Sequence, residues 1–338
     1  MTGPYARPAP LRRNGMSNEP TMRTITQDSF GGPEVLYLTQ VARPAPLPTE
    51  VLVRVHSAGV NPVDWKTRQG GGMAQVLGDP PFRVGWDVSG VVEEVGFGVH
   101  TVGVGDEVYG MPWFPRQAGA YGEYVTAPSR QFARKPTTLD HDRATAVPLA
   151  ALTAWQSLVD AARVEAGQRV LIHAAAGGVG HFAVQFAKHL GAQVIGTART
   201  AKHDWLRSLG ADELVDYTKE RFEEAVRDVD VVIDLVGDEH EETSTRSLRT
   251  LRRGGTLIAV PSGASPGLME KARAQGLRAS GFLVEPDGAA LTRIGDLIEE
   301  GAVSVEVEDV LPLAEAGEAH RRGEEGRTRG KLVLRVAS

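Results

Sequence analysis

A glycine-rich segment near the middle of the chain limits, more than any other feature, what this sequence can fold into. Residues 168–180 read Gln-Arg-Val-Leu-Ile-His-Ala-Ala-Ala-Gly-Gly-Val-Gly: a short apolar strand, a turn of small residues and a helix start. Ala175, Gly177 and Gly180 stand at the three small-residue positions of the dinucleotide-binding fingerprint. Gly177 would let the backbone approach a pyrophosphate, and Gly180 would let the helix pack on the strand. A tight turn without a ligand is the alternative.

The backbone amides at this helix start are the predicted anion-binding groups. Unpaired N–H groups and the helix dipole both favour negative charge at a helix N-terminus. We therefore expect the loop to hold a dinucleotide pyrophosphate through Ala175, Gly177, Gly178, Val179 and Gly180.

The segments around this loop predict a doubly wound parallel sheet. Short apolar runs alternate there with helical patterns, which is typical of consecutive strand–helix–strand units. The expected strands are 169–173, 193–197, 213–215, 229–235 and 255–260. The expected helices are 147–162, 178–190, 201–209 and 239–252.

The rest of the chain divides around that sheet. Over residues 22–145, short β-rich runs separated by Gly and Pro turns indicate a compact β domain. The sheet domain is placed at 146–284, and the last segment, 285–338, is expected to fold back onto the β domain. Within it, the charged stretch 321–329 is expected to be a solvated turn. Residues 1–21, rich in Pro, Gly and Arg, are expected to be a disordered extension.

Composition excludes several classes of function. The sequence of 338 residues has no cysteine, which removes disulfides, iron–sulfur clusters, thiol nucleophiles and Cys-containing zinc sites. Its 37 Lys and Arg against 43 Asp and Glu give a net charge of −6, without the basic footprint that nucleic acid needs. Neither a membrane-spanning apolar run nor a secretory signal is present in the sequence. We expect a cytoplasmic protein that binds no metal, nucleic acid or membrane.

The end of the second sheet strand selects the cofactor. NAD needs an acidic side chain there for its ribose hydroxyls, whereas this chain has Thr197-Ala198-Arg199-Thr200. An Arg beside a hydroxyl suits the 2′-phosphate of NADPH by charge and by bidentate hydrogen bonding. We predict NADPH. A solvated Arg199 with Thr200 as a helix N-cap is the plainer alternative, and both interpretations can hold together.

Several motifs in the right order resemble one protein family. They are residues 22–35, Gly59–Lys66 (GVNPVDWK), 174–180 with Gln185-Phe-Ala-Lys188, and Gly330-Lys331. With these motifs the chain resembles the zinc-independent quinone oxidoreductase branch of the medium-chain dehydrogenase/reductase superfamily from Met22 to the C-terminus. The resemblance implies an α/β fold, with a GroES-like β-rich catalytic domain plus a doubly wound parallel-sheet Rossmann domain. It also implies NADPH in the cleft between the domains, and a homodimer.

One departure from the wider superfamily is informative. Zinc alcohol dehydrogenases carry Cys near the position of Asn61, and Gly-His-Glu where this chain has Gly85-Trp86-Asp87. Without these ligands there is no Lewis acid to polarise an alcohol. This difference favours hydride transfer to acceptors that are already electrophilic, namely quinones or α,β-unsaturated carbonyls. An NADPH-binding sensor or structural protein without turnover is the alternative.

The resemblance also implies which side chains touch the cofactor. Asn61 would lie at the nicotinamide ribose, Thr153 at the nicotinamide or the phosphates, and Tyr217 at the 2′-phosphate beside Arg199. Lys66 would anchor the ribose and could relay a proton, the alternative being a surface lysine. Asn61 and Lys66 are the catalytic candidates. The remaining expected cofactor positions are Thr197, Ala198, Val236, Val260, Ser262, Phe282, Val284, Gly330 and Lys331.

The acceptor pocket is the part that the sequence defines least. Met111, Trp113, Phe114 and Tyr121 lie in a loop with Gly and Pro turns. They could wall a flat, apolar acceptor or simply pack the loop, and both alternatives stay open.

Overall fold

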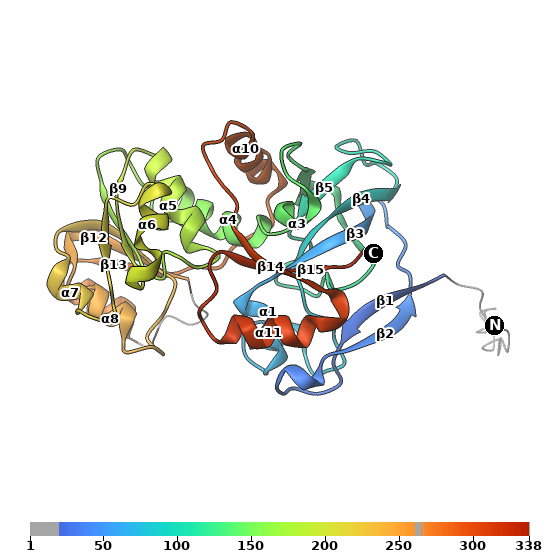
Figure 1. Cartoon of the computed structure of the whole chain (residues 1–338), viewed down its shortest axis with the longest axis horizontal. Helices are drawn as coiled ribbons and strands as arrows, with labels where there is room; N and C mark the ends of the chain where they lie inside the picture. Colours follow the sequence, from blue (N-terminus) through green and yellow to red (C-terminus); the bar gives the residue numbers. More distant parts are fainter. Residues whose placement is uncertain (1–19, 261–264, 266, 338) are drawn as a thin grey trace, which may run out of the picture.

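Six parallel strands form the sheet that the second half of the chain predicts (Figure 1). They are β8 (Arg169–Ile172), β9 (Gln193–Thr197), β10 (Glu213–Val215), β11 (Val229–Asp234), β12 (Leu251–Ala259) and β13 (Arg278–Gly281). Their spatial order is β10-β9-β8-β11-β12-β13, with the topological switch between β8 and β11. This is the strand order of the doubly wound dinucleotide-binding fold, so the predicted fold class is confirmed.

The structure, a computed structural model, describes residues 20–260, 265 and 267–337. Strand β1 (Thr21–Thr26) begins at the last residue of the predicted extension, and residues 1–19 lie outside the described residues. The domain boundaries at 145/146 and 284/285 stay predictions.

Helices cover both faces of the six-stranded sheet because its strands are apolar on both sides. Along β8, Val170 and Ile172 pack into one hydrophobic cluster with Phe182, whereas Leu171 packs into another with Phe222. This alternation follows from the two-residue period of a strand. The first face is covered by α4 (Pro148–Gln156), α5 (Gly180–His189) and α6 (His203–Ser208), the second by α7 (Phe222–Ala225), α8 (Thr243–Ser247) and α9 (Leu268–Ala274).

A second sheet of seven strands forms the β-rich part of the molecule (Figure 1). Its order is β14-β15-β3-β4-β5-β7, and β6 also pairs with β3. The last segment of the chain supplies β14 and β15, and Leu332 of β15 lies opposite Val60 of β3. The expected return of the C-terminal segment to the first part of the chain is thus observed. The strands are β3 (Glu50–Val60), β4 (Asp87–Val95), β5 (Glu107–Gly110), β6 (Tyr124–Pro128), β7 (Phe132–Arg134), β14 (Val307–Pro312) and β15 (Lys331–Arg335).

The remaining elements surround this second sheet. Strand β1 pairs with β2 (Tyr37–Ala42) in a separate antiparallel pair. In Figure 1, α1 (Pro62–Arg68) lies beside α11 (Ala316–Glu324). The other α-helices within the described part of the chain are α2 (Ala74–Leu77), α3 (His141–Ala144) and α10 (Gly288–Glu299).

Two predicted elements were wrong. The stretch 321–329 is not a simple turn, because its first residues belong to helix α11, where Glu318 pairs with Arg321 and Arg322 one helical turn later. The helix expected at 239–252 is reduced to the five residues of α8. Around it, the hydroxyls of Thr243, Ser247 and Thr250 donate to nearby backbone carbonyls, and such bonds compete with a regular helix.

Candidate functional site

The glycine-rich loop has a geometry that only small residues permit. Helix α5 begins at Gly180, where an added Cβ would lie 2.3 Å from the carbonyl oxygen of Ala174. The loop is tied to the neighbouring strand, because the Ala174 amide donates to Thr197 Oγ1 (3.2 Å) and the Ala175 amide to the Thr197 carbonyl (3.1 Å). Residues 177–179 are only partly buried at the helix start, and within the loop the Gly177 amide donates to the Ala174 carbonyl (2.9 Å). This cradle fits a pyrophosphate.

A basic and hydroxyl-rich cluster follows the end of β9. Ala198 donates its amide to the Val215 carbonyl (3.1 Å), which places the ends of β9 and β10 side by side. Arg199 is exposed and donates from Nε to the hydroxyl of Tyr217 (3.3 Å). Lys219 donates to Thr200 Oγ1 (2.7 Å). The structure thus brings the predicted pair Arg199 and Tyr217 together and adds Lys219.

The carboxylate of Asp216 beside this cluster already accepts hydrogen bonds from its neighbours. Asp216 accepts hydrogen bonds from the amide and hydroxyl of both Thr200 and Thr218, and these bonds hold its pKa well below the ordinary value. Lys202 is turned away, since its ammonium donates to the carbonyls of Arg327 and Thr328. Arg199 is therefore the cation that can face a 2′-phosphate, with Lys219 beside it, although Lys219 also lies 3.5 Å from Asp216 Oδ2.

Three further predicted positions lie at the carboxyl ends of the sheet strands. The Val236 amide donates to Asp234 Oδ1 (2.9 Å), the Val260 amide to the Asp234 carbonyl (3.0 Å), and the Phe282 amide to the Ala259 carbonyl (2.9 Å). Parallel strands bring such ends to one edge of the sheet, where ligands of doubly wound folds bind. Val284 is buried beyond this edge, and Ser262 lies outside the described residues.

Asn61 lies at the start of α1 in a buried polar triangle. Its Nδ2 donates to Asp87 Oδ2 (2.8 Å), and its Oδ1 accepts from the Lys331 ammonium. Lys331 also donates to the Val60 carbonyl (2.9 Å) and lies 3.4 Å from Asp87 Oδ2. Burial raises the pKa of Asp87 and lowers that of Lys331, and their mutual attraction opposes both shifts.

A hydrogen-bond chain continues from Asn61 into the C-terminal segment. The backbone N–H of Asn61 and the Tyr121 hydroxyl both donate to Asp64 Oδ2, at 2.7 and 2.8 Å. His320 must then donate from Nε2 to the Tyr121 oxygen (3.2 Å), because its Nδ1 accepts from Arg68, which is always a donor (3.0 Å). Burial raises the pKa of Asp64 to about 7 and lowers that of His320 to about 3. Sequence reasoning missed this chain, whose members come from distant parts of the sequence.

Lys66 and Thr153, two other predicted site residues, are not members of this hydrogen-bond chain. Lys66 is partly buried on α1, and among the described residues its ammonium makes no hydrogen bond or ion pair. Thr153 is buried on α4, and its hydroxyl donates to the Leu149 carbonyl one turn earlier (2.7 Å). Asp87 accepts from the Leu149 amide (2.7 Å), which connects α4 to the polar triangle.

Three of the four predicted acceptor residues are buried in this structure. Met111, Phe114 and Tyr121 are buried in the hydrophobic core, and the Tyr121 hydroxyl is used by Asp64. Trp113 packs at the edge of that core and donates from Nε1 to the Thr126 carbonyl (2.6 Å). These contacts favour the packing alternative.

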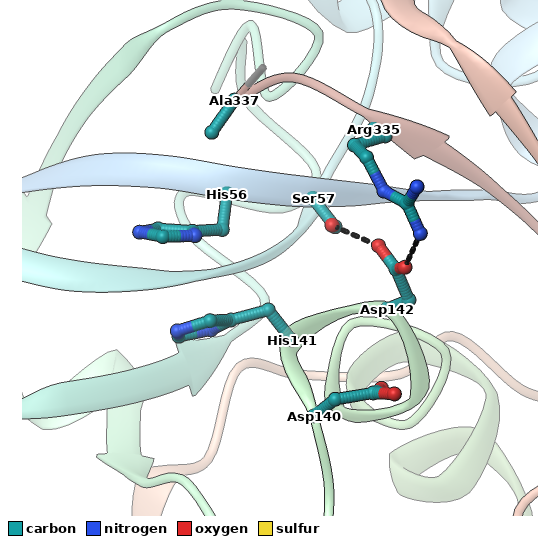
Figure 2. A pocket seen from close by; sticks show the side chains of 7 residues that line it. All are labelled: His56, Ser57, Asp140, His141, Asp142, Arg335 and Ala337. Carbon is teal, nitrogen blue, oxygen red and sulfur yellow. Dashed lines mark hydrogen bonds and ion pairs between the residues drawn. The ribbon is translucent and has the colours of Figure 1, made fainter.

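Two surface recesses lie apart from the glycine-rich loop and the polar triangle. One, of about 420 Å³, is lined by Gln156, Asp160, Ala161, Phe282, Leu283, Glu285, Pro286 and Asp287, and so borders a predicted cofactor position. Figure 2 shows the other, where Asp142 lies between Ser57 and Arg335 and accepts from both. There the rings of His56 and His141 are stacked 4.2 Å apart, and burial and the neighbouring imidazole lower the pKa of His141 to about 4.

The residues present do not fit a zinc ion. The sequence has no cysteine, and by the family resemblance Asn61 and Gly85-Trp86-Asp87 stand where zinc enzymes have Cys and Gly-His-Glu. Asn61 and Asp87 are hydrogen-bonded to each other, and the Lys331 amine lies against both side chains, which leaves no place for a cation. Within residues 20–260, 265 and 267–337, no three His, Asp or Glu side chains come together as a metal site.

Comparison with known proteins agrees with this fold. The family model "Alcohol dehydrogenase GroES-like domain" matches residues 47–137, and the model "Zinc-binding dehydrogenase" matches residues 209–334. A mitochondrial NAD(P)H oxidoreductase of Danio rerio is 31% identical over 91% of this chain and 90% of its own length. A chloroplastic NADPH-dependent alkenal/one oxidoreductase of Arabidopsis thaliana is 33% identical over 93% of this chain and 79% of its own length.

A solved structure gives the same result in three dimensions. The quinone oxidoreductase from Coxiella burnetii superimposes with a TM-score of 0.88 at 37% identity, covering 94% of this chain and all (100%) of its own. These relatives match more than nine-tenths of the chain, and the chain has no cysteine. It therefore belongs to the zinc-independent quinone oxidoreductase branch of the medium-chain dehydrogenase/reductase superfamily.

Proposed function

We propose that this protein is an NADPH-dependent reductase that transfers hydride to quinones or α,β-unsaturated carbonyls. The observation that carries the proposal is the pairing of the glycine-rich loop with Arg199, Tyr217 and Lys219 at the end of β9. A cation at that place suits a 2′-phosphate, whereas NAD needs a carboxylate there. The relatives named above, an alkenal/one oxidoreductase and a quinone oxidoreductase, support both acceptor classes.

The role proposed for each side chain follows from its position. NADPH, when bound, supplies the hydride. The loop amides hold its pyrophosphate, and Asn61, fixed by Asp87 and Lys331, faces its nicotinamide ribose. Lys66 is proposed as the ribose anchor and proton relay, since its ammonium has no other bond among the described residues. A positioned donor at the acceptor carbonyl lowers the barrier by about 3–4 kcal/mol.

The acceptor is proposed to enter at the strand edge formed by Val236, Val260 and Phe282. In doubly wound sheets, ligands bind beyond the carboxyl ends of the strands. Quinones and alkenals are electrophilic enough to accept hydride without a metal, which matches a site where the Lys331 ammonium lies against the hydrogen-bonded pair Asn61 and Asp87.

Product analysis separates this proposal from the alternative of a binding protein without turnover. The protein is incubated with NADPH and either a simple quinone or a short alkenal, and the products are identified by mass spectrometry. A hydroquinone or a saturated aldehyde, formed in equal amount to the NADPH consumed, supports the proposal. NADPH that binds but yields no product with either acceptor favours the sensor or structural role.

The assembly and the location are also proposals. A homodimer is proposed by family resemblance, and β13 is an edge strand of the six-stranded sheet that offers backbone groups for pairing. Sedimentation analysis tests it, since a monomer at micromolar concentration would contradict it. Among the described residues no helix is long and apolar enough to cross a membrane. A cytoplasmic location stays a prediction, because the relatives include mitochondrial and chloroplastic proteins.

A further inference from the structure

The side chain of Lys331 connects the two sheets at the proposed site. It starts at the first residue of β15, next to the pairing of Leu332 with Val60. Its stem passes so close to the glycine-rich loop that a Cβ added to Gly178 would lie 2.9 Å from Lys331 Cδ. Its ammonium then reaches β3 and α1 on the other side, at the Val60 carbonyl and Asn61 Oδ1.

The backbone before Lys331 is fixed as well. The Gly330 amide donates to the Ala176 carbonyl in the glycine-rich loop (3.2 Å). Gly330 has a φ of 71°, and a Cβ there would meet the Glu306 carbonyl oxygen at 2.4 Å, so only glycine fits. Lys331 is therefore anchored to the loop through its backbone neighbour and to the β-rich part through its side chain.

The ammonium has no donor left for a phosphate. A lysine ammonium carries three N–H groups, and the oxygens of Val60, Asn61 and Asp87 take all three. The group is enclosed, since Lys331 is 3% exposed, Asn61 1% and Asp87 0%. These contacts favour an indirect role for Lys331 over direct contact with the cofactor.

We propose that Lys331 is a positioning residue, which holds Asn61 and Asp87 at a fixed distance from the glycine-rich loop and so sets the gap across which hydride passes. The proposal rests on the proposed reductase function. Hydride transfer needs reacting atoms held in one geometry, and a misplacement of about 1 Å can cost about 100-fold in rate. Lys331 does not contact Arg199, and methionine keeps the apolar stem that lies against Gly178 of the loop, so NADPH affinity should be largely retained.

The test removes the ammonium together with its counter-charge. Lys331→Met alone leaves Asp87 buried without its cation and is expected to lower the thermal midpoint, whereas the double variant Lys331→Met/Asp87→Asn restores part of it. For the double variant we expect an NADPH dissociation constant within about threefold of the native value. We expect the single-turnover rate of NADPH oxidation, with the acceptor that the native protein uses fastest, to fall by about 100-fold. The primary isotope effect with deuterated NADPH should become fully expressed.

Lys188→Met is the matched control. Lys188 pairs with Asp212 at 2.6 Å on the surface of α5, with a side chain 47% exposed, so the same substitution breaks an ion pair outside the site. It should leave the single-turnover rate within twofold of native.

The outcomes separate the two proposals. A native protein that oxidises no NADPH with any acceptor contradicts the reductase function. An active native protein with a double variant that transfers hydride at the native rate overturns the positioning role and leaves the function standing. A double variant that loses NADPH affinity by tenfold or more at an unchanged transfer rate also overturns it, since Lys331 would then be a cofactor ligand.

Discussion

Replacing Gly180 by alanine should weaken NADPH binding by forcing α5 away from the strand that precedes it. The new Cβ would stand 2.3 Å from the Ala174 carbonyl oxygen and 2.7 Å from two backbone carbons of Ala175. Backbone atoms cannot rotate away, so the helix start must move by at least 3.0 − 2.3 = 0.7 Å before the contact reaches the shortest distance that real Cβ atoms show. Overpacking of this kind costs about 1–3 kcal/mol in stability. Because the displaced amides are those proposed to hold the pyrophosphate, affinity should fall by about tenfold, or about 1.4 kcal/mol.

Fluorescence titration with NADPH measures the affinity, and urea unfolding measures the stability. Gly103→Ala is the matched control, because a Cβ there has only Asp106 Oδ2 nearby, at 4.0 Å, and it should change stability by less than about 0.5 kcal/mol. A folded Gly180→Ala protein with native NADPH affinity would refute the assignment of this loop to the pyrophosphate.

Three other perturbations test separate parts of the account. Arg199→Ala should lower NADPH affinity by roughly tenfold and leave NADH affinity unchanged in the same titration, and an equal loss for both would contradict the 2′-phosphate assignment. His141 is held neutral in the folded protein, with a pKa lowered to about 4 against about 6.5 when unfolded, so its stabilising contribution is present above pH 6.5 and is lost as the pH falls towards 4. In urea unfolding, His141→Asn should reduce the loss of unfolding free energy between pH 6.5 and 4. An unchanged dependence of that free energy on pH would contradict the role of His141. Burial raises the pKa of Asp64 to about 7, so the contribution of this carboxyl to stability falls as the pH rises from about 4 to 7, opposite in sign to that of His141. Asp64→Asn should remove that loss, and a variant with the native pH profile would contradict it.

The dinucleotide loop could be predicted because its chemistry is local. Strand, turn and helix follow one another within residues 168–180, and each small residue has a steric reason that the sequence alone carries. Arg199 could be predicted for a related reason, since it follows the second strand of the sheet, whereas Tyr217 was expected from the family resemblance. Lys219, two residues beyond Tyr217, carried the same signal and was missed.

The buried polar groups could not be found in this way. Arg68 and His320 are 252 positions apart in the chain, and their hydrogen bond exists only because α11 packs beside α1. Whether Tyr121 faces a pocket or the core depends on the same long-range packing, which directs its hydroxyl at Asp64. By contrast, α11 could have been predicted, because Glu318 and Arg322 show the i,i+4 spacing of a helix.

The central claim, an NADPH-dependent reductase, is tested most directly by steady-state kinetics of the native protein with NADPH and NADH in parallel. A simple quinone and a short alkenal serve as acceptors, and kcat/KM is measured for each cofactor. We predict turnover with at least one acceptor and a kcat/KM for NADPH at least about tenfold above that for NADH. Equal values for the two cofactors would contradict the role of Arg199, and absence of turnover with both acceptors would contradict the reductase itself.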